Sequence, residues 1–241
     1  MNIIDAHSHI GNFGSWARFD FDLARLREQM AEFHIEKTLL TGANCHDNDA
    51  VLAACRAAPD LVVPIAWISP TDPGALDEIR RRVTREGFRG VKLHPLFDAY
   101  SADDDFVDPV VDLAGELGVP VFVHSGHPPY SLPWQIALLA ERHPTVPIVL
   151  LHMGHAHGVY VDAALKVARR HPNLYLETSG TSMSVKIREA YETVGENRVL
   201  FGIDSPFHEP SVEIEKTRAT HLPDDALRRI YRDNAARLLG L

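Results

Sequence analysis

Eight short apolar segments recur along the 241 residues of this chain, and stretches with helical periodicity separate them. The segments span residues 3–7, 37–42, 61–68, 90–94, 120–124, 147–152, 174–178 and 199–204. Each is apolar almost throughout, as is typical of parallel strands that are buried on both faces. In the first intervening stretch, Leu23, Leu26, Met30 and Phe33 repeat at helical spacing. The alternation predicts an α/β protein made of eight βα units.

Two architectures can be built from eight such units. An open doubly wound sheet would be expected to carry a glycine-rich phosphate-binding turn after its first strand, whereas the turn after residue 7 reads Ser-His-Ile-Gly. A (β/α)8 TIM barrel has about 250 residues and needs no such turn. No shift in composition marks a second domain. We therefore expect a single-domain TIM barrel over residues 1–241, with a last helix near residues 224–239 covering its outside.

The charge of the chain argues against one class of partner. Its formal net charge is −9, whereas nucleic-acid binding relies on clustered lysine and arginine. No apolar run approaches the length of about 18 residues that a membrane span needs, and a first strand at Ile3 leaves no room for a signal peptide. We expect a cytoplasmic protein with a small-molecule partner and with no nucleic-acid or membrane partner. Association into a homo-oligomer stays open.

The chain has two cysteines, Cys45 and Cys55. They form neither a CxxC pair nor a disulfide framework, which suits a reducing compartment. We interpret both as small residues that are buried or half-exposed.

Polar side chains gather where the predicted strands end, and a TIM barrel carries its active site at the carboxyl ends of its strands. The strand-end residues are His7, His9, Lys92, His94, His124, His152, Glu177 and Asp204. The loops just beyond the strands add His46, His127, His155, His157 and His208. Most of the histidines in the chain are therefore expected at one rim of the barrel.

His7 and His9 are two residues apart, so on a strand they point to the same side and can chelate one ion. Imidazole suits zinc, iron or nickel. His124 and His152 end two other strands at the same rim, although each alone would be read as a hydrogen-bonded core histidine. Asp204 ends an apolar strand, where a carboxylate is costly to bury unless it is paired or bound to metal; a helix N-cap is its alternative. The set predicts a site for a divalent metal.

The strand-end motifs, taken in order, resemble those of the amidohydrolase superfamily. They read Asp-Ala-His-Ser-His, Gly-Val-Lys-Leu-His-Pro, Val-His-Ser-Gly, Leu-His-Met-Gly-His, Gly-Ile-Asp-Ser-Pro-Phe and Asn-Ala-Ala-Arg-Leu-Leu. The likeness runs from residue 3 to the C-terminus and is closest to the amidohydrolase-2 group. That group includes aminocarboxymuconate-semialdehyde decarboxylase, related aromatic-acid decarboxylases and lactonases.

The resemblance implies roles for the strand-end residues. His7, His9, His124 and Asp204 would bind one or two divalent ions, usually zinc. His152 would be a ligand of a second metal or a polarising catalytic group. Asp204 would also act as the general base that takes a proton from metal-bound water.

Four further residues are open to more than one interpretation. Lys92 matches a lysine that is carboxylated and bridges two ions in binuclear members, but it could instead orient a substrate carboxylate or stay outside the metal shell. His94 shares its face and could be a ligand, a substrate contact or a hydrogen-bond donor beside the ligands. Glu177 could hold the tautomer of a ligand histidine or merely cap a strand. Trp16 could line a substrate pocket or simply pack in its loop.

The leading hypothesis is a metal-dependent hydrolase that cleaves a small ester, lactone or amide with a metal-activated water, with Asp204 as base. The alternative is a metal-dependent, non-oxidative decarboxylase of an unsaturated or aromatic carboxylic acid. A nuclease would need a basic rim, which the charge does not indicate. A catalytically silent scaffold is disfavoured because every expected acid–base position carries a competent side chain. We therefore expect an enzyme.

Overall fold

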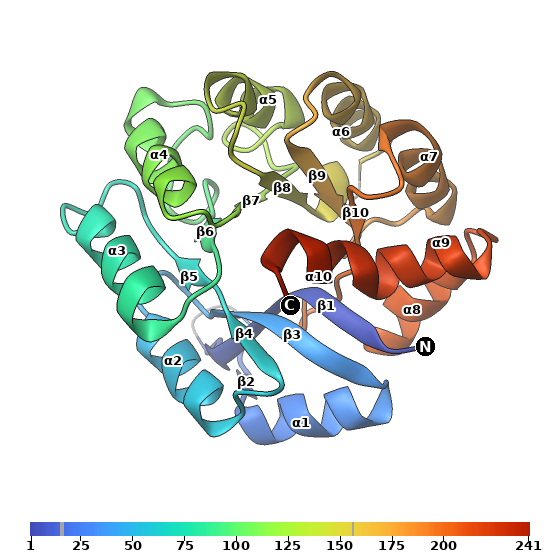
Figure 1. Ribbon diagram of the computed structural model, residues 1–241, viewed down its shortest axis with the longest axis horizontal. Coiled ribbons are helices and arrows are strands. Elements are labelled where there is room, and N and C mark those ends of the chain that lie inside the picture. Colours follow the sequence, from blue (N-terminus) through green and yellow to red (C-terminus); the bar gives the residue numbers. More distant parts are fainter. Residues whose placement is uncertain (15–16, 156) are drawn as a thin grey trace.

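Eight strand segments form the inner wall of the computed structural model, which describes residues 1–14, 17–155 and 157–241 (Figure 1). In chain order they are β1 (Ile3–Asn12), β3 (Ile35–Gly42), the consecutive pieces β4 (Val62–Pro64) and β5 (Ala66–Trp67), β6 (Val91–Leu93), β7 (Val121–His124), β8 (Ile148–Leu151), β9 (Leu174–Glu177) and β10 (Val199–Leu200). A short strand, β2 (Asp20–Phe21), pairs antiparallel with the end of β1. The eight segments coincide with the eight apolar runs of the sequence.

Neighbouring segments pair in parallel and follow their order in the chain. Three backbone hydrogen bonds join the last segment to the first: Ala6 N donates to Phe201 O at 2.9 Å, Asp204 N donates to His7 O at 2.6 Å, and His9 N donates to Ser205 O at 2.7 Å. Because β4 and β5 are pieces of one segment, they link β3 to β6. The ring of strands is thus complete, and the predicted TIM barrel is confirmed.

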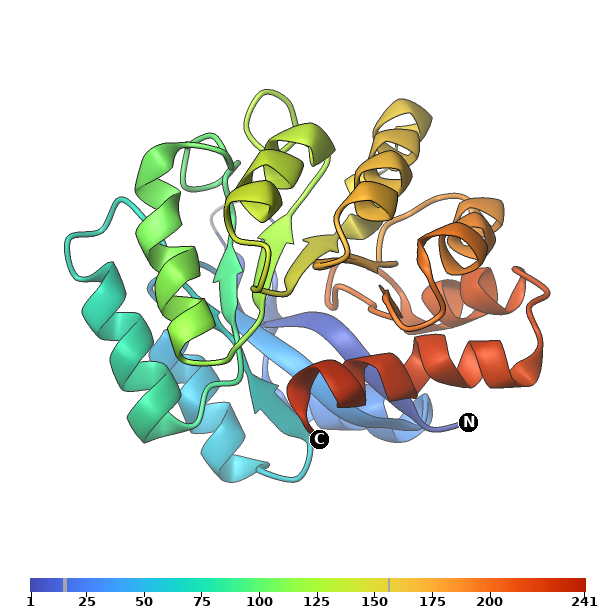
Figure 2. The same cartoon turned by 45° about the horizontal axis from the view of Figure 1, so that its top comes forward.

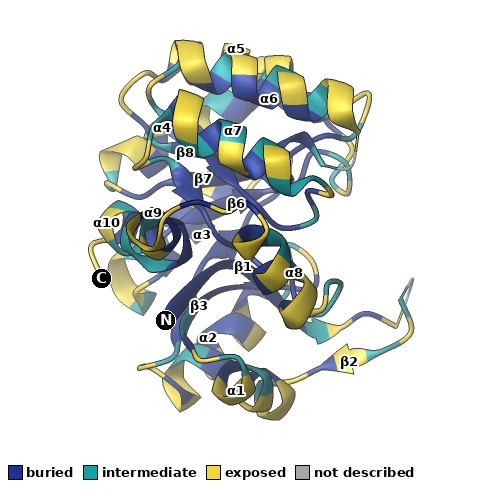
Figure 3. Ribbon diagram, turned by 90° about the vertical axis from the view of Figure 1, so that its right-hand side faces the viewer, coloured by how far each residue is buried: buried dark blue, intermediate teal, exposed yellow. Residues whose placement is uncertain are grey.

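The helices form an outer layer around the strands, with their outer faces exposed and their inner faces buried (Figure 3). They are α1 (Leu23–Glu32), α2 (Asn48–Ala57), α3 (Ala75–Glu86), α4 (Asp108–Glu116), α5 (Pro133–Arg142), α6 (Gly158–Arg170), α7 (Ser184–Val194) and α8 (Pro210–Arg218), with the short η1 (Asp105–Val107) and η2 (His152–Gly154) between them. No helix in the described ranges is long and apolar enough to cross a membrane.

The strand side chains divide into two apolar layers, as the two-residue period of a strand dictates. Residues such as Leu40, Val123 and Leu150 belong to the larger cluster beneath the helices. Their neighbours Leu39 and Phe122 face the barrel interior and belong to a second, smaller cluster. The barrel is therefore a packed core whose polar residues are restricted to one end.

The C-terminal segment lies elsewhere than expected. It comprises α9 (Asp224–Arg228), η3 (Arg229–Asp233) and α10 (Asn234–Leu239), and it closes the amino-terminal end of the strands instead of covering the outside of the barrel (red in Figures 1 and 2). Ala235 and Leu239 pack with the interior cluster, and Phe201 N donates to Ile230 O at 3.0 Å. The expectation was wrong because the interior apolar layer would otherwise meet water at this end.

Candidate active site

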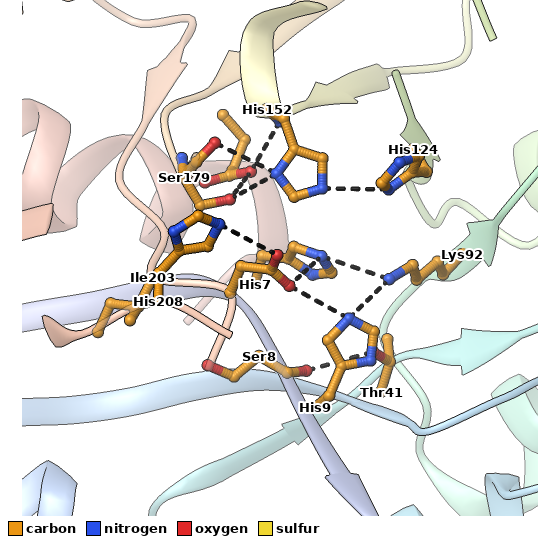
Figure 4. A network of polar contacts seen from close by, with 12 residues as sticks. His7, Ser8, His9, Thr41, Lys92, His124, His152, Ser179, Ile203 and His208 are labelled. Carbon is orange, nitrogen blue, oxygen red and sulfur yellow. Dashed lines mark hydrogen bonds and ion pairs between the residues drawn. The ribbon is translucent and has the colours of Figure 1, made fainter. Parts of the chain in front are cut away.

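A cavity of about 310 Å³ opens at the carboxyl ends of the strands. Histidines from several strand ends line it, together with an aromatic wall made by Phe13, Trp67, Phe97 and Phe207. Figure 4 shows the polar network at its floor. The strand ends therefore converge, as the sequence predicted.

Three donor atoms meet at the floor of this cavity. Asp204 Oδ1 lies 3.2 Å from His7 Nε2 and 3.3 Å from His9 Nε2. Bonds of about 2.0–2.1 Å to a tetrahedral zinc ion place neighbouring donor atoms about 3.3 Å apart. Both contacts of Asp204 Oδ1 therefore have the spacing of neighbouring donor atoms in one coordination site, and His152 contributes a further nitrogen within 4.8 Å of the ligand atoms of His7 and Asp204.

Backbone carbonyls fix the tautomers of two of these histidines. His9 Nδ1 lies 2.8 Å from Gly42 O, and His152 Nδ1 lies 3.2 Å from Ser179 O. A carbonyl only accepts, so each Nδ1 carries the proton and each Nε2 keeps its lone pair. A neutral imidazole in this tautomer is a competent metal ligand.

Charges at the floor are set by burial and close contact. Burial lowers the pKa of His7 to about 3 and lowers that of His9, so both rings are neutral near pH 7. Burial alone would raise the pKa of Asp204, but the contacts with His7 and His9 hold it well below its usual range. The floor thus combines neutral nitrogen donors with one ionised carboxylate, which is a donor set that suits a divalent cation.

A β-bulge directs His7 and His9 into the cavity. Ile4 and Ala6 face the barrel interior, so a regular strand would send His7 and His9 to the opposite face. Between Asp5 and Ser8, however, β1 has one more residue than β3, since Asp5 pairs with Thr38 and Ser8 with Leu40. The extra residue turns the side chains of His7 and His9 back toward the barrel interior.

The carboxylate of Asp5 holds this bulge in place. It is buried and accepts hydrogen bonds from His7 N, Ile203 N, Ser8 Oγ and Thr38 Oγ1 at 2.5–3.2 Å. Burial raises its pKa to about 6 despite these bonds. We did not predict a role for Asp5, although a carboxylate inside an apolar strand beside the two histidines was a usable signal.

Lys92 reaches the same floor. Its Nζ lies 3.0 Å from His9 Nε2 and 3.3 Å from His7 Nε2, and 4.8 Å from the centre of the Trp67 ring. Burial lowers the pKa of this amine to about 7. The structure thus brings Lys92 beside the donor atoms, where a permanently charged ammonium would compete with a metal ion.

A second group of histidines continues from the floor to the rim. His152 Nε2 lies 3.1 Å from His124 Nδ1, and His124 Nε2 lies 2.8 Å from His127 Nδ1. His124 therefore adjoins the donor cluster through His152 and does not contact Asp204 in the described network. His155 extends the group, with its ring 4.6 Å from that of His127.

Glu177 supports His152 indirectly. Its carboxylate accepts hydrogen bonds from His152 N at 3.1 Å and from Ser179 Oγ at 2.8 Å, and it contacts no imidazole ring in the described residues. Burial raises its pKa to about 8. Since Ser179 in turn contacts His152 Nδ1, Glu177 positions the ring through the serine. We did not predict the role of Ser179.

His94 lies in a stack of rings. The centre of its ring is 3.9 Å from that of His124 and 4.2 Å from that of Phe97. Its Nδ1 accepts from Phe97 N at 3.3 Å, so the proton is on Nε2 and the ring is a donor toward its surroundings. Trp16, the remaining predicted substrate contact, lies outside the described residues.

Comparison with known proteins tests the predicted function. The γ-resorcylate decarboxylase of Rhizobium sp. (strain MTP-10005) is 27% identical over 248 residues, covering 80% of this chain and 75% of that protein. The prediction of a hydrolase for a small ester, lactone or amide is therefore wrong, and the relatives favour the decarboxylase alternative. The error has a physical reason: the same metal ligands serve both chemistries, and the difference lies in the loops.

Solved structures show the same fold. A dihydroxybenzoic acid decarboxylase from Polaromonas sp. JS666, solved with manganese and the inhibitor 2-nitroresorcinol, is 20% identical, with a TM-score of 0.79 and coverage of 100% of this chain and 98% of that one. An uncharacterised TIM-barrel protein from Bordetella bronchiseptica is 23% identical, with a TM-score of 0.82 and coverage of 100% and 99%. Finally, the sequence model of the family described as amidohydrolase matches residues 4–241. The chain is therefore an enzyme of the amidohydrolase family.

Proposed function

We propose that the chain is a metal-dependent, non-oxidative decarboxylase of hydroxylated benzoic acids, with residues 1–241 acting as one barrel domain. The observation that carries this proposal is a cavity with aromatic walls and one ionised carboxylate, Asp204, at its floor. The decarboxylases of γ-resorcylate and dihydroxybenzoic acid among its relatives and structural neighbours support it.

The cavity suits a flat anionic substrate. Its volume of about 310 Å³ is sufficient for one substituted benzene ring. Phe13 and Phe207 meet edge to face on one side with ring centres 5.1 Å apart, and Trp67 and Phe97 are stacked at 6.1 Å on another. Among the described residues that line it, none is arginine or lysine. A bound benzoate would therefore take its countercharge from a metal ion at the floor, where Lys92 is the nearby amine.

His7, His9 and Asp204 would hold that ion, with His152 beside them. When bound, a divalent cation supplies positive charge for the carboxylate and hydroxyl oxygens of the substrate. Imidazole nitrogen and carboxylate oxygen suit zinc, and the Polaromonas structure contains manganese. We infer zinc or manganese as the metal.

Decarboxylation needs a proton at the ring carbon that bears the carboxylate. That proton adds to the carbon, the bond to the carboxylate breaks, its electron pair returns to the ring, and carbon dioxide leaves. Asp204 is ionised in the free enzyme, so it has to accept a proton before it can deliver one to the ring carbon; Oδ1 faces His7 and His9, which leaves Oδ2 for this role. His208 Nε2 lies 3.9 Å from Oδ2, too far for a direct hydrogen bond, and its side chain is 34% exposed, so a water molecule between the two residues would have to bring the proton to Oδ2.

The test is incubation of the metal-loaded enzyme with 2,6-dihydroxybenzoate in D2O. We expect release of carbon dioxide and formation of resorcinol with deuterium at the carbon that carried the carboxylate. Unsubstituted benzoate is the matched control and should not react, because it has no hydroxyl beside the carboxylate. Metal-replete enzyme that releases no carbon dioxide from any mono- or dihydroxybenzoate would contradict the proposal.

A further inference from the structure

A second group of metal-ligating side chains lies outside the active-site cavity. Cys45 and His46 follow β3, and Asp72 lies between β5 and α3. One ligand atom from each of the three residues lies within 4.8 Å of the other two. All three line a separate cavity of about 410 Å³. Sulfur, nitrogen and oxygen donors from two different loops thus face one space.

This group is surrounded by negative charge. The Asp98 carboxylate lies near Cys45 and accepts from Trp67 Nε1 at 3.0 Å. In the described part of the chain, neither Asp72 nor Asp98 forms an ion pair with lysine or arginine. The two carboxylates thus place negative charge beside the donor atoms.

The two arginines that line the same cavity pair with other carboxylates. Arg82 pairs with Asp49, Glu78 and Glu86 at 2.7–2.8 Å. Arg81 pairs with Glu78 and Glu86 at 2.7–2.8 Å. Both guanidinium groups are engaged by carboxylates of α3 and of the start of α2, and in the described residues neither forms an ion pair with Asp72.

We propose that Cys45, His46 and Asp72 bind a thiophilic divalent cation such as Zn²⁺, with water as a further ligand. Thiolate, imidazole and carboxylate are the three ligand types that zinc takes in proteins. Bonds of about 2.3 Å to sulfur and about 2.0–2.2 Å to nitrogen and oxygen place these donor atoms about 3.3–3.6 Å apart. His46 and Asp72 are exposed, so their side chains can close from the present span onto one ion.

The bound cation would join two loops that border the active site. Ala43, in the loop of Cys45, lines the active-site cavity, and Trp67, just before the loop of Asp72, lines both cavities. Trp67 also stacks on His94 with ring centres 5.0 Å apart. The second site therefore stabilises the rim from outside, and its ligands are separate from those at the floor.

The experiment is a titration of the metal-loaded enzyme with Co²⁺, followed by the sulfur-to-metal charge-transfer band. The active-site donors are nitrogen and oxygen, so this band can come only from a cysteine, and the chain has two. We expect the band in the wild type together with one extra metal ion per chain. Cys45→Ser should abolish both. Cys55→Ser is the matched control, because Cys55 lies in α2 near Val62 O, and it should change neither.

A second pair of variants makes the test independent of Cys45. Asp72→Asn should weaken the binding of the extra cation at least about tenfold, because it removes a charged ligand. Asp60→Asn, at another exposed carboxylate, should leave it unchanged. The proposal is wrong if folded wild-type enzyme shows no band at saturating Co²⁺, if the band survives Cys45→Ser, or if Asp72→Asn binds as the wild type does.

Discussion

The two oxygens of Asp204 have different surroundings: Oδ1 faces His7 and His9, and Oδ2 is proposed to carry the proton. A single substitution tests this proposed proton transfer. Asp204→Asn keeps the shape of the side chain but cannot carry a proton. We expect the rate of carbon dioxide release to fall by about 10²–10⁴-fold, the usual contribution of a positioned acid or base. Stopped assays for carbon dioxide, with metal content measured in parallel, provide the check. Normal turnover with metal still bound would exclude Asp204 as the proton carrier.

Asp5 acts on the metal site without touching the cavity. Asp5→Asn places an amide NH2 among four donors, so we expect a loss of about 1–3 kcal/mol in the free energy of unfolding. Because the bulge directs His7 and His9, the metal dissociation constant should rise by about 10–100-fold, as for other groups that hold ligands. Competition with a chelating dye measures this dissociation constant.

The matched control for this substitution is Asp22→Asn. The Asp22 side chain caps α1 by accepting from Arg25 N, far from the cavity. The asparagine side-chain oxygen can still accept this bond, so the free energy of unfolding should change by less than about 0.5 kcal/mol and metal affinity should stay unchanged. Equal metal affinities in the Asp5 and Asp22 variants would show that the bulge does not position the ligands.

At the scale of the element, the segment from α9 to α10 makes the clearest prediction. Leu239 is 5% exposed and packs with the interior cluster, so Leu239→Ala should lower the free energy of unfolding by about 2–4 kcal/mol. The active site lies at the other end of the strands, so kcat of the folded enzyme should not change. Urea unfolding and steady-state assays of the same preparation separate the two effects.

Leu241→Ala removes the same atoms from a side chain that is 46% exposed. It should therefore cost far less stability. If both leucine variants were equally stable, the C-terminal segment would not be packed into the end of the barrel as described.

The elements differ in how well the sequence could predict them. The strands were predictable because parallel strands buried on both faces are apolar along their length. The bulge in β1 was not, since one extra residue between Asp5 and Ser8 leaves the apolar pattern unchanged. The C-terminal helix was predicted in extent but misplaced, because its apolar face does not reveal which surface it covers.

Some features of the candidate site could likewise be predicted from the sequence, and others could not. The carboxyl ends of parallel strands meet in a barrel, so the convergence of His7, His9 and Asp204 could be predicted from their positions at strand ends. The chemistry could not. It depends on residues such as Phe97 and Phe207, whose loops come together only in the folded chain.

At the scale of the whole molecule, buried neutral histidines make stability depend on pH. Burial lowers the pKa of His7, His9, His94, His124 and His152 below the ordinary value of 6.5. A lowered folded-state pKa contributes stability that is complete above the unfolded value and is lost as the pH falls below it. The free energy of unfolding of metal-free enzyme should therefore fall between about pH 6.5 and the His7 pKa of about 3, by about 1.4 kcal/mol per pH unit for each net proton taken up on unfolding. The raised pKa values of Asp5 and Glu177 oppose part of this fall, because these two carboxyls release protons on unfolding.

His94→Phe tests this dependence, because phenylalanine preserves the ring stack and cannot bind a proton. Urea unfolding at several pH values should give a slope that is smaller by about one proton than that of the wild type. Identical slopes would mean that His94 does not take up a proton on unfolding.

In the described residues, the packed interior layer and the C-terminal segment together close the barrel below the active-site cavity. The described lining of the cavity lies at the carboxyl ends of the strands, so in the proposed reaction carbon dioxide and the phenol would leave through the opening by which the substrate enters. The next substrate molecule could then bind only after the phenol has been released. Product release through this opening, and not bond cleavage alone, can then limit the rate of turnover. Substitutions in the loops of the rim would change that rate.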